Sequence, residues 1–308
     1  MLDCVVVGGG PAGLTAAIYL ARFHLDVRLI DAGNSRAATI PMTRNHAGFP
    51  DGIAGADLLD RMRAQARRYG AALARAEVIG LEAAVDGLHV AVGDEVIATR
   101  TVLLATGVVN RRPPVPDDLH ATALARGLLR YCPICDGYEV TDRRVAVLGT
   151  SGHGTREAVF LRSFTADVTL IAPEGRHDLA PAERALLAQC GVATVDGPAT
   201  AFSIDGDKIG LRTGECEWRF DSLYPALGSD INSGVATGLG AARSDEGCLI
   251  VDPHQRTNVA RLYAAGDVVK GLDQISHAMG EGGVAATTIR NDLASEHALL
   301  RPHRVNKE

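Results

Sequence analysis

The sequence predicts an α/β protein that contains two Rossmann-like nucleotide-binding domains. Three observations support this fold class: a glycine-rich turn between a strand and a helix near the start, a second such turn in the middle, and a composition with 46% hydrophobic and 22% charged residues. A chain of 308 residues is long enough for two domains, each with its own core.

The first predicted unit begins with the apolar run Cys4–Val7, a glycine-rich turn and a helical stretch that ends near Phe23. In the turn, Gly8 permits the tight bend, Gly10 lets a pyrophosphate approach the backbone, and Gly13 lets the helix pack on the strand. We therefore expect a dinucleotide site here, and the alternative is a packing turn without a ligand. The turn residues expected at the cofactor are Gly8, Gly10, Pro11, Ala12 and Gly13.

An acidic residue completes this pattern. A second apolar run, over residues 27–30, ends at Asp31, which lies 23 residues after Gly8. At this spacing a carboxylate can accept hydrogen bonds from the ribose hydroxyls of a dinucleotide. Asp31 is therefore a candidate cofactor-binding residue.

The rest of the first unit is predicted from shorter signals. A charge-rich helix over 56–69 precedes strands between residues 78 and 97, and a buried strand over 101–104 ends in the small-residue turn Ala105-Thr106-Gly107. Such a turn permits close approach to the backbone. Near the C-terminus, a short strand ends in Gly266-Asp267 and precedes a small-residue helix over 276–293, where the Asp267 carboxylate could bind a polyol.

A second strand, turn and helix occupy residues 145–163, with the turn Gly149-Thr150-Ser151-Gly152-His153-Gly154. Ser151 stands at the middle glycine position, where its Cβ would crowd a pyrophosphate. The next strand ends at Ala172 instead of an acidic residue, Glu174 follows, and we expect no basic residue to hold a 2′-phosphate. Two interpretations stay open: a nicotinamide nucleotide site, or a Rossmann-like scaffold that has lost its ligand.

Just before the second turn lies Cys132-Pro133-Ile134-Cys135-Asp136-Gly137. Two cysteines at this spacing can close a small disulfide ring, and the spacing favours a low-pKa thiolate and reversible oxidation. Zinc normally needs a second ligand pair, but the other four cysteines are scattered singly, so we predict no metal site. An inert pair is the remaining alternative. Asp136 could supply the proton that a departing sulfur needs, and Tyr131 and Tyr138 are expected to pack beside the dithiol.

Charge and hydropathy exclude several classes of protein. The net charge is −6 with no basic run, which argues against nucleic acid or an anionic membrane as a partner. No stretch approaches the roughly 18 apolar residues of a membrane-spanning helix, and the opening apolar run is too short for a signal peptide. We expect a cytoplasmic protein, because a reducing compartment is where such a dithiol is typically catalytic.

Taken together, these segments resemble the low-molecular-weight thioredoxin reductase family of FAD-dependent disulfide oxidoreductases, over essentially the whole chain. The resemblance implies that a three-layer ββα FAD domain (1–112 plus 232–308) is interrupted by an NAD(P)H-binding-like domain (113–231) that carries the dithiol. It also implies a homodimer. The residues that it places at FAD are Gly8, Gly10, Pro11, Ala12, Gly13, Asp31, Asn45, Ala105, Thr106, Gly107, Gly266, Asp267, Gln274 and Ile275.

Two departures from the family bear on the electron source. Where the family carries a His-Arg-Arg run for NADPH, this chain has Ala172-Pro173-Glu174, and the Arg-Gln-Ala run after Gly-Asp is replaced by Gln274-Ile275-Ser276. Because a carboxylate would repel the 2′-phosphate, we expect that NADPH is not used. Ferredoxin, oxygen, NADH or a second flavin could then be the electron donor or acceptor.

The resemblance also suggests roles in catalysis. Cys135 would exchange electrons with the flavin, Cys132 would exchange with the substrate, and Asp136 would carry the proton. The partner would be a thioredoxin-like protein or a small-molecule disulfide or dithiol. A dithiol oxidase that uses oxygen, an ordinary NAD(P)H-dependent thioredoxin reductase and a flavin-binding redox sensor are the alternatives.

Overall fold

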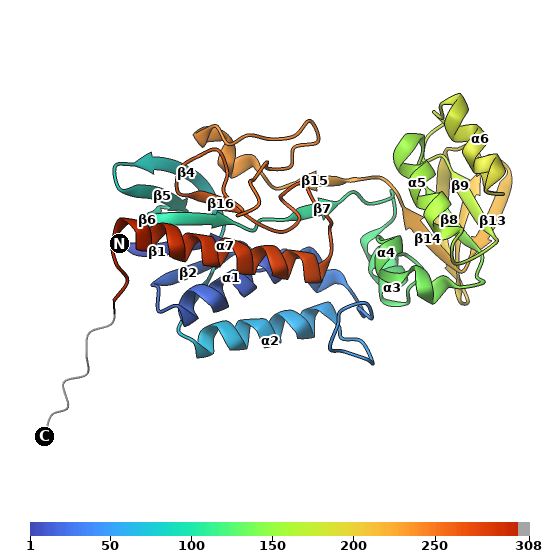
Figure 1. The fold of residues 1–308 in the computed structure, drawn as a ribbon. Coiled ribbons are helices and arrows are strands. Elements are labelled where there is room, and N and C mark those ends of the chain that lie inside the picture. Colours follow the sequence, from blue (N-terminus) through green and yellow to red (C-terminus); the bar gives the residue numbers. More distant parts are fainter. Residues whose placement is uncertain (301–308) are drawn as a thin grey trace, which may run out of the picture. The chain divides into compact units, whose positions relative to one another are not determined.

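The computed structural model describes residues 1–300, which divide by their contacts into two compact units (Figure 1). The first unit comprises Met1–Thr39, Ala56–Val108 and the chain from Ile231 onward. The second unit comprises Ile40–Gly55 and Val109–Asp230. Sequence reasoning kept segment 40–55 in the first domain, whereas its contacts group it with the second unit.

The first unit is built on one sheet in the order β3-β2-β1-β6-β5-β4, with β16 also paired to β6. Strand β6 joins two kinds of pairing, because its first half pairs antiparallel with β5 and its second half pairs parallel with β1 and β16. Its C-terminal residues 102–104 are fully buried. The strands are β1 (Leu2–Val7), β2 (Val27–Asp31), β3 (Ala72–Arg75), β4 (Val78–Ala84), β5 (Gly87–Val92), β6 (Glu95–Leu104) and β16 (Leu262–Ala264).

Helices α1 (Pro11–Arg22), α2 (Gly55–Arg68) and α7 (Ile275–Glu296) lie on one side of β1 and β6, and strands β4 and β5, which continue the sheet beyond β6, lie on the opposite side of β6 from these helices (Figure 1). Helices α1 and α7 pack closely, and Gly282 of α7 makes this possible, because a Cβ there would meet the Ala12 carbonyl oxygen at 2.3 Å. Two 3-10 turns, η1 (Arg36–Thr39) and η3 (Gly234–Leu239), complete the unit.

The second unit contains a fully parallel sheet in the order β10-β9-β8-β14. Its strands are β8 (Val145–Leu148), β9 (Val168–Ile171), β10 (Ala193–Val195) and β14 (Ser222–Pro225). All residues of β8, β9 and β14 are buried, as expected for a parallel sheet covered on both faces. The helices are α3 (Asp117–Ala125), α4 (Pro133–Asp136), α5 (Ser151–Leu161) and α6 (Pro181–Gln189), with the 3-10 turn η2 (Gly137–Val140).

An antiparallel sheet, in the order β11-β12-β13, also belongs to the second unit. It consists of β11 (Ala199–Asp205), β12 (Lys208–Thr213) and β13 (Cys216–Phe220), and sequence analysis did not predict it. Where the chain passes between the two units, β7 (Val108–Asn110) and β15 (Ser229–Ile231) form a two-stranded sheet.

The predicted α/β class with two Rossmann-like units is confirmed. Both predicted strand–turn–helix segments are present, as β1, α1 and β2 in the first unit and as β8, α5 and β9 in the second. Helix α5 starts at Ser151, inside the predicted turn, where Ser151 adopts a left-handed φ of 51°. No helix among residues 1–300 is long and apolar enough to cross a membrane.

The close packing of α1 and α7 can be tested by two glycine substitutions in one helix. We expect Gly282→Ala to lower the free energy of unfolding by about 1–3 kcal/mol, because backbone must shift to admit the methyl group. The matched Gly280→Ala has no atom within 4 Å of the new Cβ, and should stabilise the helix by up to about 1 kcal/mol. Urea unfolding of both variants measures the difference, and equal effects would contradict the packing described here.

Candidate active site

Cys132 and Cys135 form a disulfide at the start of α4. Pro133 occupies the first helical position, where its missing N–H costs nothing. The backbone N–H of Cys135 donates to the carbonyl oxygen of Cys132 at 2.9 Å and contacts its Sγ at 3.1 Å. A donor aimed at Sγ favours the thiolate form of Cys132 once the disulfide is reduced.

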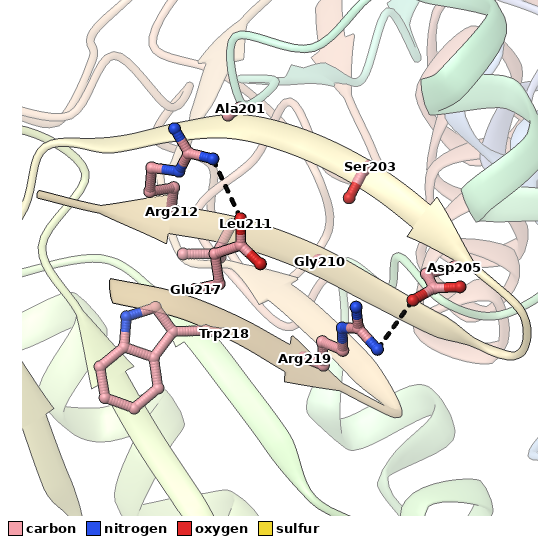
Figure 2. A pocket seen from close by; sticks show the side chains of 9 residues that line it. All are labelled: Ala201, Ser203, Asp205, Gly210, Leu211, Arg212, Glu217, Trp218 and Arg219. Carbon is pink, nitrogen blue, oxygen red and sulfur yellow. Dashed lines mark hydrogen bonds and ion pairs between the residues drawn. The ribbon is translucent and has the colours of Figure 1, made fainter. Parts of the chain in front are cut away.

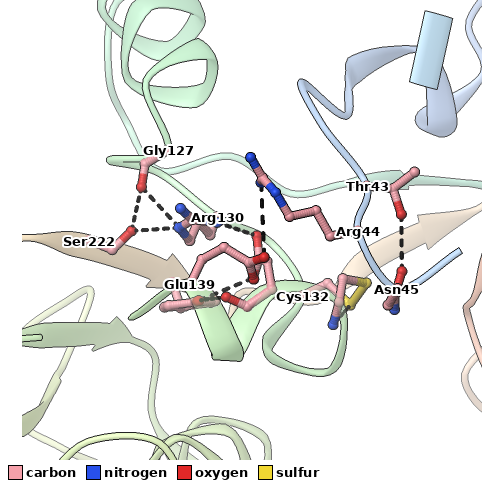
Figure 3. Close-up of polar contacts among 11 residues, drawn as sticks. Thr43, Arg44, Asn45, Gly127, Arg130, Cys132, Glu139 and Ser222 are labelled. Carbon is pink, nitrogen blue, oxygen red and sulfur yellow. Dashed lines mark hydrogen bonds and ion pairs between the residues drawn. A yellow bond between two sulfur atoms is a disulfide. The ribbon is translucent and has the colours of Figure 1, made fainter. Parts of the chain in front are cut away.

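The carboxyl group of Asp136 lies within a partly buried polar network, whose members Gly127, Arg130 and Ser222 are labelled in Figure 3. Its Oδ2 accepts from Arg130 Nη1 at 2.9 Å, and its Oδ1 accepts from the Tyr224 hydroxyl at 3.1 Å. Arg130 is fixed by donating Nε–H to the Gly127 carbonyl and the Ser222 hydroxyl, at 3.0 and 3.1 Å. Burial raises the pKa of Asp136 although Arg130 and the Tyr224 hydrogen bond oppose the change.

Sequence analysis did not find Arg130 or Tyr224. Arg130 precedes the dithiol without any motif, and Tyr224 lies 88 residues after Asp136, on the buried strand β14. Tyr131 packs as expected, because it is partly buried and its hydroxyl lies 2.8 Å from His120 Nε2. The expectation for Tyr138 was wrong: its side chain points to solvent and is 80% exposed.

Glu139 and Arg44 border the same network (Figure 3). Glu139 Oε1 lies 3.9 Å from Arg44 Nη1, and Glu139 Oε2 is buried without a hydrogen-bond partner. Asn45, the residue expected to contact FAD, accepts a hydrogen bond from Thr43 at 3.0 Å and also lies in the second unit.

The turn between β1 and α1 forms a backbone cradle in the first unit. Gly8 has a φ of 110°, and a Cβ on it would meet the Ala105 carbonyl oxygen at 2.2 Å. A Cβ on Gly13 would meet the Gly8 carbonyl oxygen at 2.0 Å. Gly10 caps the twelve-residue helix α1 without a side-chain hydrogen bond, and Pro11 begins it. The free N–H groups of such a helix end suit a pyrophosphate.

Residues from three other segments border this cradle. Asp31 ends β2 and accepts a hydrogen bond from the Gly33 N–H at 3.0 Å, and a Cβ on Gly9 would touch its carboxylate. Ala105 contacts Gly8 as described, and the adjacent Thr106 donates its hydroxyl to the Asn232 carbonyl at 2.6 Å. The predicted residues Gly8, Gly13, Asp31 and Ala105 therefore surround one turn.

Gly266 and Asp267 follow β16. A Cβ on Gly266, which has a φ of 78°, would meet Ala12 Cβ at 2.9 Å, so this segment also touches the α1 turn. Asp267 pairs with Arg36 at 2.7 Å, and Arg36 also lies 3.2 Å from Asp273, whose pKa is raised by burial. Gln274 caps α7 and Ile275 begins it. Arg36 is a cation that sequence analysis missed.

The second nucleotide turn is bonded to another segment of its own unit. The Ser151 N–H donates to the Asp178 carbonyl at 3.0 Å, and the Thr150 hydroxyl accepts from the Asp178 N–H at 2.9 Å. His177 is buried beneath, with Nδ1 3.4 Å from the Thr150 hydroxyl. A Cβ on Gly152 would meet Arg156 Nη1 at 3.1 Å and Glu183 Oε1 at 3.2 Å, so a basic and an acidic side chain stand together at the start of α5.

A hollow also lies over the three-stranded sheet of the second unit (Figure 2). Its charges neutralise each other in pairs: Arg212 lies 3.0 Å from Glu217, and Arg219 lies 2.8 Å from Asp205. We therefore assign no site to it. Within residues 1–300, no group of three or more His, Cys, Asp or Glu side chains is arranged to hold a metal ion.

Comparisons with known proteins agree with this geometry. A family model described as pyridine nucleotide-disulphide oxidoreductase matches residues 2–282. The thioredoxin reductase of Mycolicibacterium smegmatis is 32% identical over 307 residues, covering 96% of this chain and 97% of that protein. The crystal structure of HlmI superposes with a TM-score of 0.86 at 30% identity, covering 96% of this chain and 93% of that chain.

A thioredoxin reductase from Streptococcus pyogenes MGAS5005 is also similar in structure, with a TM-score of 0.87 at 26% identity. That alignment covers 96% of this chain and 99% of the other. Family, fold and the Cys132–Cys135 disulfide thus lead to one assignment. The chain belongs to the pyridine nucleotide-disulphide oxidoreductase family, as a flavin-dependent enzyme similar to low-molecular-weight thioredoxin reductases.

Proposed function

We propose that this enzyme exchanges electrons between FAD and the Cys132–Cys135 pair, and that it does so without NADPH. The observation that carries the second part is the Ser151–Asp178 backbone hydrogen bond, because it uses an N–H at the start of α5 that a bound pyrophosphate would need. The first part is supported by the family, by the disulfide and by the open cradle before α1.

The first unit is the proposed FAD domain, and its residues fit the cofactor. The cradle at Gly8, Gly10 and Gly13, continued by Pro11 and Ala12, would hold the pyrophosphate, and Asp31 would bind the ribose hydroxyls. FAD, when bound, would supply the two-electron chemistry through which the cysteines are oxidised or reduced. The remaining proposed contacts in this unit are Ala105, Thr106, Gly107, Gly266, Asp267, Gln274 and Ile275, whereas Asn45, which the resemblance also assigns to FAD, belongs to the second unit by its contacts.

Arg36 is a further residue that suits this cofactor. Three acidic groups, Asp267, Asp273 and Glu281, lie close together after β16, and Arg36 pairs with the first two. The pyrophosphate of FAD would be repelled by these carboxylates, so a cation between them helps to neutralise the site. Arg36 is therefore proposed to hold Asp267 in place and to offset the negative charge.

The second unit supplies the proposed thiol chemistry. Cys132, whose Sγ faces the Cys135 N–H, is the proposed nucleophile toward substrate, and Cys135 is the sulfur that communicates with the flavin. Asp136 is the proposed proton donor to the departing sulfur. Its raised pKa brings the protonated form closer to neutral pH than an ordinary aspartic acid would be.

Two further features oppose NADPH. Strand β9 is followed by Ala172 and Pro173 instead of basic residues, and Glu174 adds a negative charge. At Gly152 the charges of Arg156 and Glu183 offset each other. A charge-assisted hydrogen bond contributes about 1.5–3 kcal/mol, so the loss of two weakens binding by roughly a hundredfold to ten-thousandfold. The scaffold would then keep the nucleotide-binding fold without the ligand.

An ordinary NAD(P)H-dependent thioredoxin reductase is the second candidate function. Two arginines that sequence analysis did not consider support it. Arg176 is exposed in the segment that crosses the second turn, and Arg184 donates to the His177 carbonyl at 3.2 Å. If that segment moved away, these side chains could bind a 2′-phosphate. Ferredoxin, oxygen, NADH or a second flavin are the electron partners compatible with our proposal.

A thioredoxin-like protein is the proposed partner, since curated relatives are named thioredoxin reductases. Two exposed side chains next to the disulfide support a protein partner: Ile134 lies between the cysteines and is 52% exposed, and Tyr138 is 80% exposed. Apolar groups displayed around a reactive dithiol favour contact with another protein surface. A small-molecule disulfide or dithiol is the alternative partner, and the homodimer stays a prediction.

The roles of the two cysteines can be separated by substitution. Cys132→Ser and Cys135→Ser should each abolish disulfide turnover while FAD stays bound, because the FAD cradle belongs to the other unit. Only the Cys132→Ser protein should show the long-wavelength charge-transfer absorbance of a Cys135 thiolate beside oxidised flavin. Cys216→Ser, at an exposed free cysteine, is the matched control and should behave as wild type. Turnover in either active-site variant would contradict the assignment.

The second nucleotide turn can be tested by equilibrium binding. Calorimetric titration of the FAD-loaded protein with NADP⁺ should give a dissociation constant in the millimolar range or weaker, roughly a thousandfold above a micromolar site. Glu174→Arg together with Glu183→Gln should improve binding only slightly, because the Ser151–Asp178 hydrogen bond remains. Micromolar binding of NADP⁺ by the wild-type protein would contradict the proposal and favour an ordinary NAD(P)H-dependent thioredoxin reductase.

A further inference from the structure

One carboxyl oxygen of Glu139 is buried beside the dithiol, and Glu139 has no role in the chemistry proposed above. Its Oε2 atom is inaccessible to water and has no hydrogen-bond partner. Its Oε1 atom has only a distant cation, Arg44 Nη1 at 3.9 Å. A buried carboxylate oxygen without a donor is costly, so its retention beside the dithiol needs a reason.

Glu139 belongs to the electrostatic surroundings of Asp136. Around that carboxyl, Arg130 comes from the loop before α4, Tyr224 from β14 and Glu139 from η2. The negative charge of Glu139 raises the pKa of Asp136 and also that of Tyr224, which places it close to both groups. Helix α5, which packs against α4, carries the charged pair Arg156 and Glu157, and Phe164 packs on Gly137.

Hydrogen-bond capacity links Glu139 to the protonated state of Asp136. Asp136 Oδ2 accepts from Arg130 and Oδ1 accepts from Tyr224, so the ionised carboxylate is well satisfied. Protonated Asp136 carries an additional O–H donor, and that donor needs an acceptor in the same buried region. Glu139 Oε2 is an acceptor there that lacks a donor.

We propose that Glu139 is a positioning residue that keeps the Asp136 carboxyl group protonated beside the dithiol until a sulfur leaves. This inference rests on the proposed function. Arg130 and Tyr224 favour the ionised carboxylate, whereas burial and Glu139 favour the protonated form. The opposing groups keep the proton available for transfer.

The proton of Asp136 is used when the substrate disulfide is cleaved. The Cys132 thiolate attacks one sulfur of the substrate disulfide, a Cys132–substrate S–S bond forms, and the substrate S–S bond breaks. The electron pair of the broken bond goes to the departing sulfur, which takes the proton of Asp136 and leaves as a thiol. Cys135 then attacks Cys132 Sγ, so that the Cys132–Cys135 bond forms and the Cys132–substrate bond breaks. The second substrate sulfur takes the electron pair of that bond and the proton given up by Cys135, and leaves as a thiol, while Asp136 regains a proton from water.

The test measures this step as a function of pH. FAD-loaded enzyme, reduced beforehand with dithiothreitol and freed of it, is mixed anaerobically with hydroxyethyl disulfide. Quenched samples analysed by mass spectrometry give the rate of disulfide closure. Because the protonated form of Asp136 is needed, the rate should fall as pH rises through the pKa of Asp136. We call this fall the alkaline limb of the pH profile, and Asp136→Asn should remove it.

Two variants should move the alkaline limb in opposite directions. Glu139→Gln removes a charge that raises the pKa of Asp136, so the limb should move to lower pH. Tyr224→Phe removes a hydrogen bond that lowers this pKa, so the limb should move up. The exposed Glu215→Gln removes the same charge elsewhere in the unit and should leave the profile unchanged. General structural damage would not produce shifts of opposite sign.

A second substrate separates proton transfer from nucleophilic attack. An aromatic disulfide such as dithiobis(nitrobenzoate) releases a low-pKa thiolate that needs no proton. With this substrate, Asp136→Asn, Glu139→Gln and Tyr224→Phe should therefore all show the wild-type pH profile. If wild-type enzyme reacts with both disulfides but Glu139→Gln and Tyr224→Phe leave the limb in place, the role of Glu139 is refuted. If reduced wild-type enzyme reacts with neither disulfide, the proposed function itself fails.

Discussion

The partly buried hydrogen bonds of Asp136 are the interaction on which the proposed chemistry depends. Arg130 and Tyr224 hold this carboxyl group directly after the second cysteine, at 2.9 and 3.1 Å, while burial opposes its ionisation. Without these partners a partly buried carboxyl group would be costly, and without burial the pKa of Asp136 would not be raised. The fold contributes by placing Tyr224 on a fully buried parallel strand, which fixes its hydroxyl.

The two nucleotide turns share a strand–turn–helix plan and differ in how their backbone donors are used. At α1, Gly8, Gly10 and Gly13 keep side chains out of the turn, and the cap makes no side-chain hydrogen bond. At α5, the Ser151 N–H already donates to the Asp178 carbonyl, and the opposite charges of Arg156 and Glu183 stand together at Gly152. One fold thus offers an anion cradle in the first unit and an internally satisfied turn in the second.

Local signals predicted much of this arrangement. The first turn, Asp31 and the dithiol were found because strand, turn, helix and cysteine spacing are encoded within a few residues. Arg36–Asp267 and Tyr224–Asp136 were not found, because their partners lie 231 and 88 residues apart and meet only in the fold. The three-stranded sheet and the Ser151–Asp178 bond were missed for the same reason, since backbone pairing between distant segments leaves no residue-type signal.

The most direct test of the central claim is an anaerobic stopped-flow comparison of electron donors. The oxidised, FAD-loaded enzyme is mixed separately with NADPH, NADH and dithiothreitol, and the absorbance of oxidised flavin is followed. Our account predicts rapid bleaching by the dithiol through Cys132 and Cys135, and negligible bleaching by NADPH at the same concentration. Rapid bleaching by micromolar NADPH would contradict it.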